Sequence, residues 1–137
     1  MPKQIYNIII DSNLWISFLI TNQFQFGKKL FTNSHIFFSE ELYLELSEVV
    51  KKTKFLKYFS QESVSELLDV IKEYAEFIEV NSVVDICRDK KDNFLLALAK
   101  DSCADFLITG DNDLLILEIF CGTKIIKIYV PFCSPFI

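Results

Sequence analysis

The pattern of apolar and polar positions predicts strands and helices that alternate along the chain. The near-continuous β-branched and aromatic run Gln4–Ile10 is typical of a central strand that is buried on both faces. It stops at Asp11–Asn13, three residues that favour turns and helix caps, and Leu14–Ile20 then predicts a buried helix. Further strands are predicted at Ile36–Phe38, Val80–Val84, Phe106–Ile108 and Lys124–Val130, and further helices at Gln23–Phe31, Glu40–Lys52, from Ser60 to Ile78, Asp92–Asp101 and Asn112–Phe120.

This alternation has the spacing of βαβ units. Such units predict an α/β fold in which a parallel sheet is covered by helices on both faces. Ser39 and Ser60 are the predicted N-caps of the helices that follow them. With 137 residues and neither a linker nor a repeat, the chain is predicted to form one domain, residues 1–137.

Composition and charge narrow the class of protein. Hydrophobic residues make up 51% of the chain and charged residues 24%, with 3 Gly and 3 Pro, which excludes disordered and collagen-like classes. The net charge of −5 argues against a protein that coats nucleic acid, because such proteins are normally basic. It does not argue against a nucleic-acid enzyme whose acidic residues bind metal ions.

The four cysteines, at positions 87, 103, 121 and 133, match no common zinc or haem spacing, and His35 is the sole histidine. We interpret the cysteines as reduced core residues of a cytoplasmic protein. The longest apolar stretch, Ile8–Ile20, is interrupted by three polar residues, so the sequence predicts neither a membrane span nor a secretory signal.

Acidic residues follow two of the predicted strands at the point where each ends. Asp11 comes directly after the first strand, and Asp111 and Asp113 follow the strand Phe106–Ile108. Ligands of doubly wound sheets bind outside the carboxyl ends of the strands, so these carboxylates are expected at one rim. Taken singly, each acid could instead cap the next helix.

Two more acids fall on helix faces that are predicted to point inward. On a helical wheel Glu45 lies about 60° from Leu42 and about 40° from Val49, at the edge of the inward stripe, and Asp92 lies beside Leu95. An inward carboxylate is costly unless it is paired or bound to a cation. A shared metal ion is one compensation; a salt bridge to lysine, or an N-cap in the case of Asp92, is the alternative.

A carboxylate set without histidine or cysteine selects hard cations, which indicates Mg²⁺ or Mn²⁺. One or two such ions would suit hydrolysis of a phosphodiester, since they lower the pKa of a water and clamp the phosphate. No Ser–His–Asp triad can be assembled around His35. The glycines at 27, 110 and 122 are isolated, so the sequence holds no glycine-rich phosphate loop.

Four short motifs stand in order from the first strand to about residue 126. They are Ile10–Leu14, Ser39–Val50 with its Glu45, Asp89–Asn93, and Ala104–Leu114 with its Thr109-Gly110-Asp111. Together they resemble the PIN-domain family, in particular its toxin branch from bacterial type II toxin–antitoxin systems (VapC-like ribonucleases). The chain departs from the family pattern at Ser12, where a Thr is usual, and at Lys90 and Lys91, where a Pro is usual.

The resemblance implies a three-layer α/β/α sandwich around a mostly parallel sheet of four to five strands. It also implies an endoribonuclease that depends on Mg²⁺ or Mn²⁺. The family's acidic quartet corresponds to Asp11, Glu45, Asp92 and Asp111, with Asp113 as a supporting or alternative metal ligand. Asn13 and Thr109 match small polar positions that orient the acids or water, and Asn93 is a further supporting residue.

In the mechanism that this implies, Asp11 and Asp92 hold the principal metal. Glu45 positions water or a second ion, and Asp111 completes the ring. The expected partners are an RNA substrate and a small cognate antitoxin, and a homodimer is left open. Candidate lysines for the RNA phosphates are Lys51, Lys52, Lys54, Lys90 and Lys91, for each of which a solvated surface is the equal alternative.

Two other functions stay open from the sequence. One is a non-catalytic α/β interaction module that holds a structural metal. The other is a phosphoaspartyl phosphatase built on Asp11, although that chemistry wants a second Asp where this chain has Asn13. Metal-dependent cleavage of RNA distinguishes the nuclease from both.

Overall fold

The computed structural model describes residues 5–20, 29, 31–52, 55 and 57–127. They include a six-stranded sheet with the strand order β3-β2-β1-β4-β6-β5. Neighbouring strands are parallel except β5, which runs antiparallel to β6. The strands are β1 (Tyr6–Ile10), β2 (Ser34–Phe38), β3 (Glu76–Phe77), β4 (Phe106–Ile108), β5 (Ile119–Phe120) and β6 (Thr123–Ile126), and the helices are α1 (Ser12–Ile20), α3 (Glu40–Val49), α4 (Gln61–Tyr74), α5 (Lys90–Ser102) and α6 (Asn112–Leu115).

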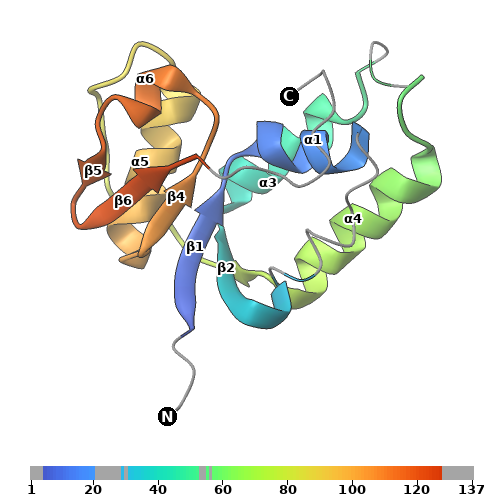
Figure 1. Ribbon diagram of the computed structural model, residues 1–137, viewed down its shortest axis with the longest axis horizontal. Helices are drawn as coiled ribbons and strands as arrows, with labels where there is room; N and C mark the ends of the chain where they lie inside the picture. The colour runs from blue at the N-terminus through green and yellow to red at the C-terminus, as the bar shows by residue number, and fades with distance from the viewer. Residues whose placement is uncertain (1–4, 21–28, 30, 53–54, 56, 128–137) are drawn as a thin grey trace.

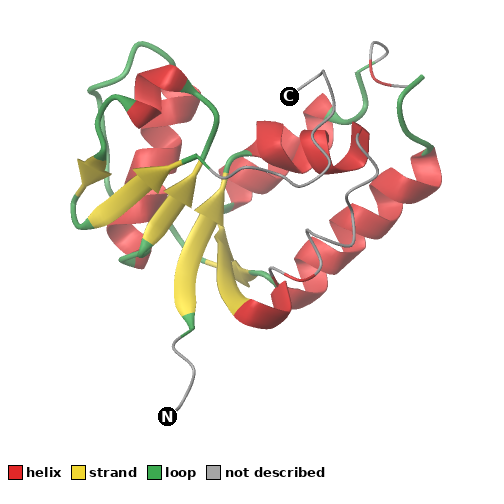
Figure 2. Cartoon of the chain, in the orientation of Figure 1, coloured by secondary structure: helices red, strands yellow, loops and turns green. Residues whose placement is uncertain are grey.

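Helices cover both faces of this sheet. Helices α1, α3 and α4 lie on one side and α5 and α6 on the other, with the strands between them (Figures 1 and 2). Both helical layers contribute fully buried side chains to the core, such as Trp15 and Phe18 of α1 and Leu96 and Leu98 of α5. The predicted α/β sandwich is therefore confirmed. Its sheet has six strands rather than four or five because the two-residue strands β3 and β5 extend its edges.

The chain changes direction across the sheet at β1. From β1 it proceeds through β2 to β3, and then crosses by way of α5 to β4 on the other side of β1. The N–H of Asp11 donates to the carbonyl of Ile108 at 2.9 Å, which joins the carboxyl ends of β1 and β4. At their amino ends, the Asp105 carboxylate accepts a 2.8 Å hydrogen bond from the N–H of Asn7. The boundary between β1 and β4 is the topological switch point, where open α/β sheets bind ligands.

Residues 80–84 form a loop, so the predicted strand Val80–Val84 is wrong. The N–H groups of Asn81 and Ser82 donate to the carboxylate of Asp101 at 2.6 and 2.8 Å, and the Ser82 hydroxyl donates to the same group. Because a side chain of α5 satisfies these donors, the segment needs no strand partner. The sheet is extended instead by β3, which pairs with β2.

The helix predicted at Asn112–Phe120 ends at Leu115, because the chain then enters a β-hairpin. Cys121 and Gly122 connect β5 to β6 with φ angles of 49° and 85°. Positive φ at both positions of a two-residue loop matches the type I′ hairpin, which favours glycine. The Cys-Gly pair at positions 121 and 122 is the local sequence signal for this turn.

The predicted N-caps are confirmed, with shifts at some helix ends. Ser39 and Ser60 each accept a hydrogen bond from a main-chain N–H in the first turn of the helix that follows. Helix α4 ends earlier than predicted, at Tyr74. Helix α5 begins two residues earlier than predicted, at Lys90, because Asp89 caps it.

Some predicted features lie outside the described residues. They are most of the helix Gln23–Phe31, the last residues of the strand Lys124–Val130, and Cys133. Among the helices that the structure describes, none combines the length and the apolar character that crossing a membrane requires.

The three described cysteines are free thiols. Cys87 is half-buried, whereas Cys103 and Cys121 are exposed. The prediction that the cysteines are core residues is therefore wrong for these two. Both lie at positive φ in turns, Cys103 at the end of α5 and Cys121 in the hairpin.

Candidate metal centre

Asp11 is the first residue after β1, and it is only 5% exposed. The Thr109 hydroxyl donates to Asp11 Oδ2 at 2.8 Å and accepts a 3.0 Å hydrogen bond from the N–H of Asp111. Burial raises the pKa of Asp11 above its usual value, the hydrogen bonds from Thr109 and from the Asn13 N–H oppose this rise, and the charge of Asp111 adds to it. A buried carboxylate held in this way is stabilised by a nearby cation.

Asp92 lies in the first turn of α5 and is also 5% exposed. Asp89, not Asp92, caps this helix, so the N-cap alternative is wrong for Asp92. Its Oδ2 atom is buried and has no hydrogen-bond partner among the described residues. Burial, with the neighbouring carboxyl of Asp111 acting in the same direction, raises the pKa of Asp92 to about 7. A buried oxygen without a donor is costly unless a proton or a cation satisfies it.

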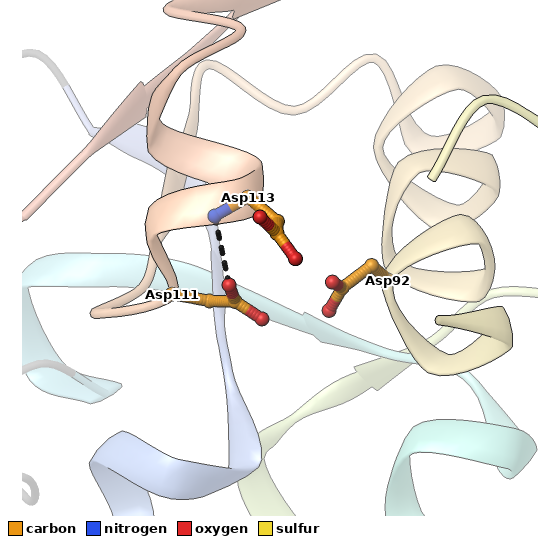
Figure 3. A group of neighbouring side chains, drawn as sticks. All are labelled: Asp92, Asp111 and Asp113. Carbon is orange, nitrogen blue, oxygen red and sulfur yellow. Dashed lines mark hydrogen bonds between the residues drawn. The ribbon is translucent and has the colours of Figure 1, made fainter. Parts of the chain in front are cut away.

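Asp111 and Asp113 bring two further carboxylates from the start of α6. Asp111 caps this helix, since its Oδ1 accepts a 2.9 Å hydrogen bond from the N–H of Asp113. One oxygen from each of Asp92, Asp111 and Asp113 lies within 4.8 Å of the other two. Figure 3 shows the three side chains pointing toward one another from α5 and α6. Asp111 therefore serves both as a helix cap and as a member of a potential ligand set.

Glu45 approaches the same acids from α3. Its Oε1 lies 3.7 Å from Nζ of Lys91, so the salt bridge to lysine that the sequence left open is present at this residue. Burial raises the pKa of Glu45, the Lys91 charge opposes this, and the Asp11 charge adds to the rise. In the part of the chain that the structure describes, no Lys or Arg forms an ion pair with Asp11, Asp92 or Asp111.

A cleft of about 190 Å³ connects four of the five predicted acids. Its lining consists of Asp11, Asn13, Glu45, Val49, Lys52, Phe55, Asp89, Lys91, Asp92, Leu95 and Asp111. Asp113 is not part of this lining and adds its carboxylate from the side of α6. The cleft is therefore a predominantly acidic space at the switch point of the sheet.

The predicted phosphate-binding lysines divide into three groups. Lys52 and Lys91 line the acidic cleft. Lys51 and Lys90 are exposed and lie outside its lining. Lys54 falls outside the described residues.

The two predicted supporting asparagines have different surroundings. Asn13 is exposed and lines the cleft. Asn93 is buried, and its Oδ1 accepts hydrogen bonds from the N–H groups of Ile86 and Cys87 at 3.1 and 2.8 Å, while its Nδ2 donates to the Cys87 carbonyl at 3.0 Å. Asn93 thus holds the loop before α5 in place, and the hydrogen bonds named here join it to this loop and not to the acids.

Three residues near the acids had no role in the sequence analysis. Asp89 and Phe55 line the cleft. Arg88, the sole arginine of the chain, places its Nη2 atom 3.2 Å from Asp113 Oδ2. An acid three residues before Asp92 was the available signal for Asp89. The contact of Arg88 joins segments 25 residues apart and has no local signal.

The donor set fits a divalent cation that prefers oxygen ligands. The converging side chains of Asp92, Asp111 and Asp113 offer carboxylate oxygens only. The unpartnered Oδ2 of Asp92 is an atom that such a cation would satisfy. Among the described residues, the cleft lining contains no histidine or cysteine, which would select softer metals.

Fold and site together define an α/β sandwich with an acidic centre, whose donors fit a divalent cation, at the switch point of its sheet. The family model of the PIN domain matches residues 7–113, and the chain belongs to the PIN-domain family. PIN domains are generally nucleases that use divalent metals, so this is a nuclease-type domain. The chain is also similar to the uncharacterized protein MJ1680 of Methanocaldococcus jannaschii, with 30% identity over 127 residues that cover 86% of this chain and 79% of the relative.

Proposed function

We propose that this protein is an endoribonuclease that depends on Mg²⁺ or Mn²⁺. The observation that carries the proposal is the buried Asp92 carboxylate with its unpartnered Oδ2, beside Asp11, Asp111 and Glu45 at the switch point. An unpaired buried carboxylate lowers the stability of the fold, so a purely structural role does not account for it. A divalent cation that binds at this position for catalysis does account for it.

Asp11 and Asp92 are the residues that would hold the principal metal. When bound, a divalent metal lowers the pKa of a water and neutralises charge on the scissile phosphate. Thr109 keeps Asp11 oriented, since its hydroxyl is hydrogen-bonded on both sides. Asp111 is the further carboxylate next to these two ligands, and Asp113 supports the site from α6. Glu45 orients water at the wall of the cleft.

RNA would enter along the lysine-bearing wall of the cleft. Of the described residues that line the cleft, Lys52 and Lys91 are the two cations, and both lie at its α3–α5 side. Lys91 is shared with Glu45 at 3.7 Å, so a phosphate would compete with this carboxylate for the ammonium group. Lysine contacts to phosphate add affinity without sequence preference.

Neutral substitution of the central acids tests the activity. Asp11→Asn and Asp92→Asn should each reduce Mg²⁺-dependent RNA cleavage by roughly a hundredfold or more, since each removes a ligand charge. Asp69→Asn, at an exposed position of α4, is the matched control and should cleave like the parent. The proposal is wrong if the Asp11 and Asp92 variants degrade RNA as fast as the parent protein in Mg²⁺.

We further propose that the protein is the toxin of a toxin–antitoxin pair in the cytoplasm, as the motif resemblance implies. A small antitoxin would then bind this chain and block the cleft. Co-expression with the neighbouring open reading frame and co-purification test this role. A short partner that inhibits cleavage supports it, whereas a neighbour that neither binds nor inhibits contradicts it.

A further inference from the structure

A second hollow lies next to the acidic cleft, between α3 and α5. Its volume is about 340 Å³, larger than that of the cleft. Its apolar lining residues are Leu42, Leu44, Val49, Phe94 and Leu95. We refer to it as the apolar groove.

The apolar groove is continuous with the cleft. Five residues line both spaces: Glu45, Val49, Lys52, Lys91 and Leu95. Because the two spaces share a wall, a polymer held at the carboxylates can extend into the groove. The groove is therefore placed to contact the part of a substrate next to the reacting group.

Two large apolar side chains of the groove are not buried by the fold. Phe94 is 54% exposed and Leu44 is 50% exposed. Neither belongs to the core cluster or to the partly buried side chains packed against it. The next two residues of α5, Leu95 and Leu96, are buried, so Phe94 alone of these three apolar residues faces the solvent.

The charges around the groove favour a neutral, aromatic occupant. Glu41 and Glu48 line it away from the shared wall and repel a phosphate there. Lys52 and Lys91 lie at the junction with the cleft, where they attract a phosphate. The lysines can therefore bind the phosphate backbone of a nucleic acid, and the apolar part of the groove can bind an uncharged flat base. Single-stranded nucleic acid offers both groups to a protein.

We propose that the apolar groove is a nucleobase subsite, in which a base next to the scissile phosphate packs against Phe94 and Leu44. This inference rests on the proposed function, since it takes the substrate to be a single-stranded nucleic acid. Phe94 is then a specificity-determining residue, and the protein binds unpaired RNA in preference to duplexes. The base is recognised by its flat apolar face, so several base types are accepted.

The test compares two short RNA oligomers of equal charge, oligo-uridine and the same backbone without bases. Their affinities are measured by fluorescence anisotropy in Ca²⁺, for the parent and for Phe94→Ala, Leu44→Ala and Val83→Ala. The parent should bind oligo-uridine about tenfold more tightly than the abasic oligomer. Phe94→Ala and Leu44→Ala should lose most of this preference while binding the abasic oligomer as the parent does. Val83→Ala, at a 92% exposed position outside the groove, should retain the preference.

The outcomes separate this inference from the nuclease proposal. A parent without base preference, or a preference that survives in Phe94→Ala, overturns the nucleobase subsite and leaves the groove to a protein partner. Loss of the preference in Phe94→Ala supports it, whether or not the parent cleaves RNA. If cleavage in Mg²⁺ is absent while the Phe94-dependent preference is present, the nuclease proposal fails and the subsite stands. Circular dichroism and urea unfolding show that each variant is folded.

Discussion

The Thr109 hydroxyl lies 2.8 Å from Oδ2 of Asp11, across 98 residues of sequence, and it accepts the N–H of Asp111 at 3.0 Å. One buried hydroxyl therefore ties together the loops that follow β1 and β4. Each of these loops carries a predicted metal ligand. The two bonds thus hold the Asp11 carboxylate beside the main chain of Asp111, although the two carboxylates repel each other.

Thr109→Val should lower the free energy of unfolding by about 1–3 kcal/mol, because it leaves a buried carboxylate and a main-chain N–H without their partner. It should also weaken Mn²⁺ binding, since Asp11 loses its orientation. Urea unfolding and Mn²⁺ titration measure the two effects. Thr109→Ser is the control, because it retains the hydroxyl and should keep most of the metal affinity. Equal loss in both variants would show that the methyl group, not the hydroxyl, is what matters.

Asp92 makes the stability of the metal-free protein depend on pH. Its pKa is raised to about 7 in the folded protein from the usual 3.8, so the folded state holds this proton more tightly than the unfolded state. Stability is therefore highest at low pH and falls as the pH rises from about 4 through about 7. The raised pKa values of Asp11 and Glu45 act in the same direction.

Urea unfolding in EDTA should show this loss of stability as the pH is raised from about 5 to about 8. Asp92→Asn should be more stable than the parent by about 2 kcal/mol at the upper end, and its slope should be shallower. Saturating Mn²⁺ should reverse the trend in the parent, because metal and protons compete for the same oxygens. An Asp92→Asn protein with the same pH dependence as the parent would rule out Asp92 as the source.

The strand-end acids could be predicted from the sequence because a parallel sheet brings the ends of its strands to one edge. Asp11 and Asp111 follow from that rule, and Asp92 follows from its place on an inward helix face. Arg88 could not be predicted, since its contact with Asp113 depends on how two loops meet. The loop at residues 80–84 was misassigned for the same kind of reason. Its β-branched residues favour a strand. However, the carboxylate of Asp101, 19 and 20 residues away, accepts hydrogen bonds from two main-chain N–H groups of the loop.

Asn93 should control the loop that precedes α5. Asn93→Ala removes three part-buried hydrogen bonds to the main chain of Ile86 and Cys87 and leaves those main-chain groups without this partner. The expected loss of stability is about 1–3 kcal/mol, and urea unfolding measures it. Asn81→Ala is the matched control, because the exposed Asn81 uses its main chain to bind Asp101. If both variants unfold alike, the side chain of Asn93 does not hold the loop.

Arg88 and Asp113 form an exposed ion pair at the edge of the carboxylate cluster, with side chains 89% and 49% exposed. Exposed pairs contribute little to stability, so Arg88→Gln should change the free energy of unfolding by less than about 1 kcal/mol. Its effect on metal binding should be larger, since the guanidinium competes with a cation for the Asp113 carboxylate.

Arg88→Gln should therefore bind Mn²⁺ about two- to fivefold more tightly than the parent, whereas Asp113→Asn should bind it more weakly. Arg88→Lys retains the charge and should stay close to the parent. Isothermal titration with Mn²⁺ at constant ionic strength measures all three, because salt would otherwise screen the pair. The decisive result is that Arg88→Gln raises the Mn²⁺ affinity whereas Asp113→Asn lowers it. If Arg88→Gln weakens Mn²⁺ binding, the arginine supports the site instead of competing with it, and Asp113 is not free to act as a ligand.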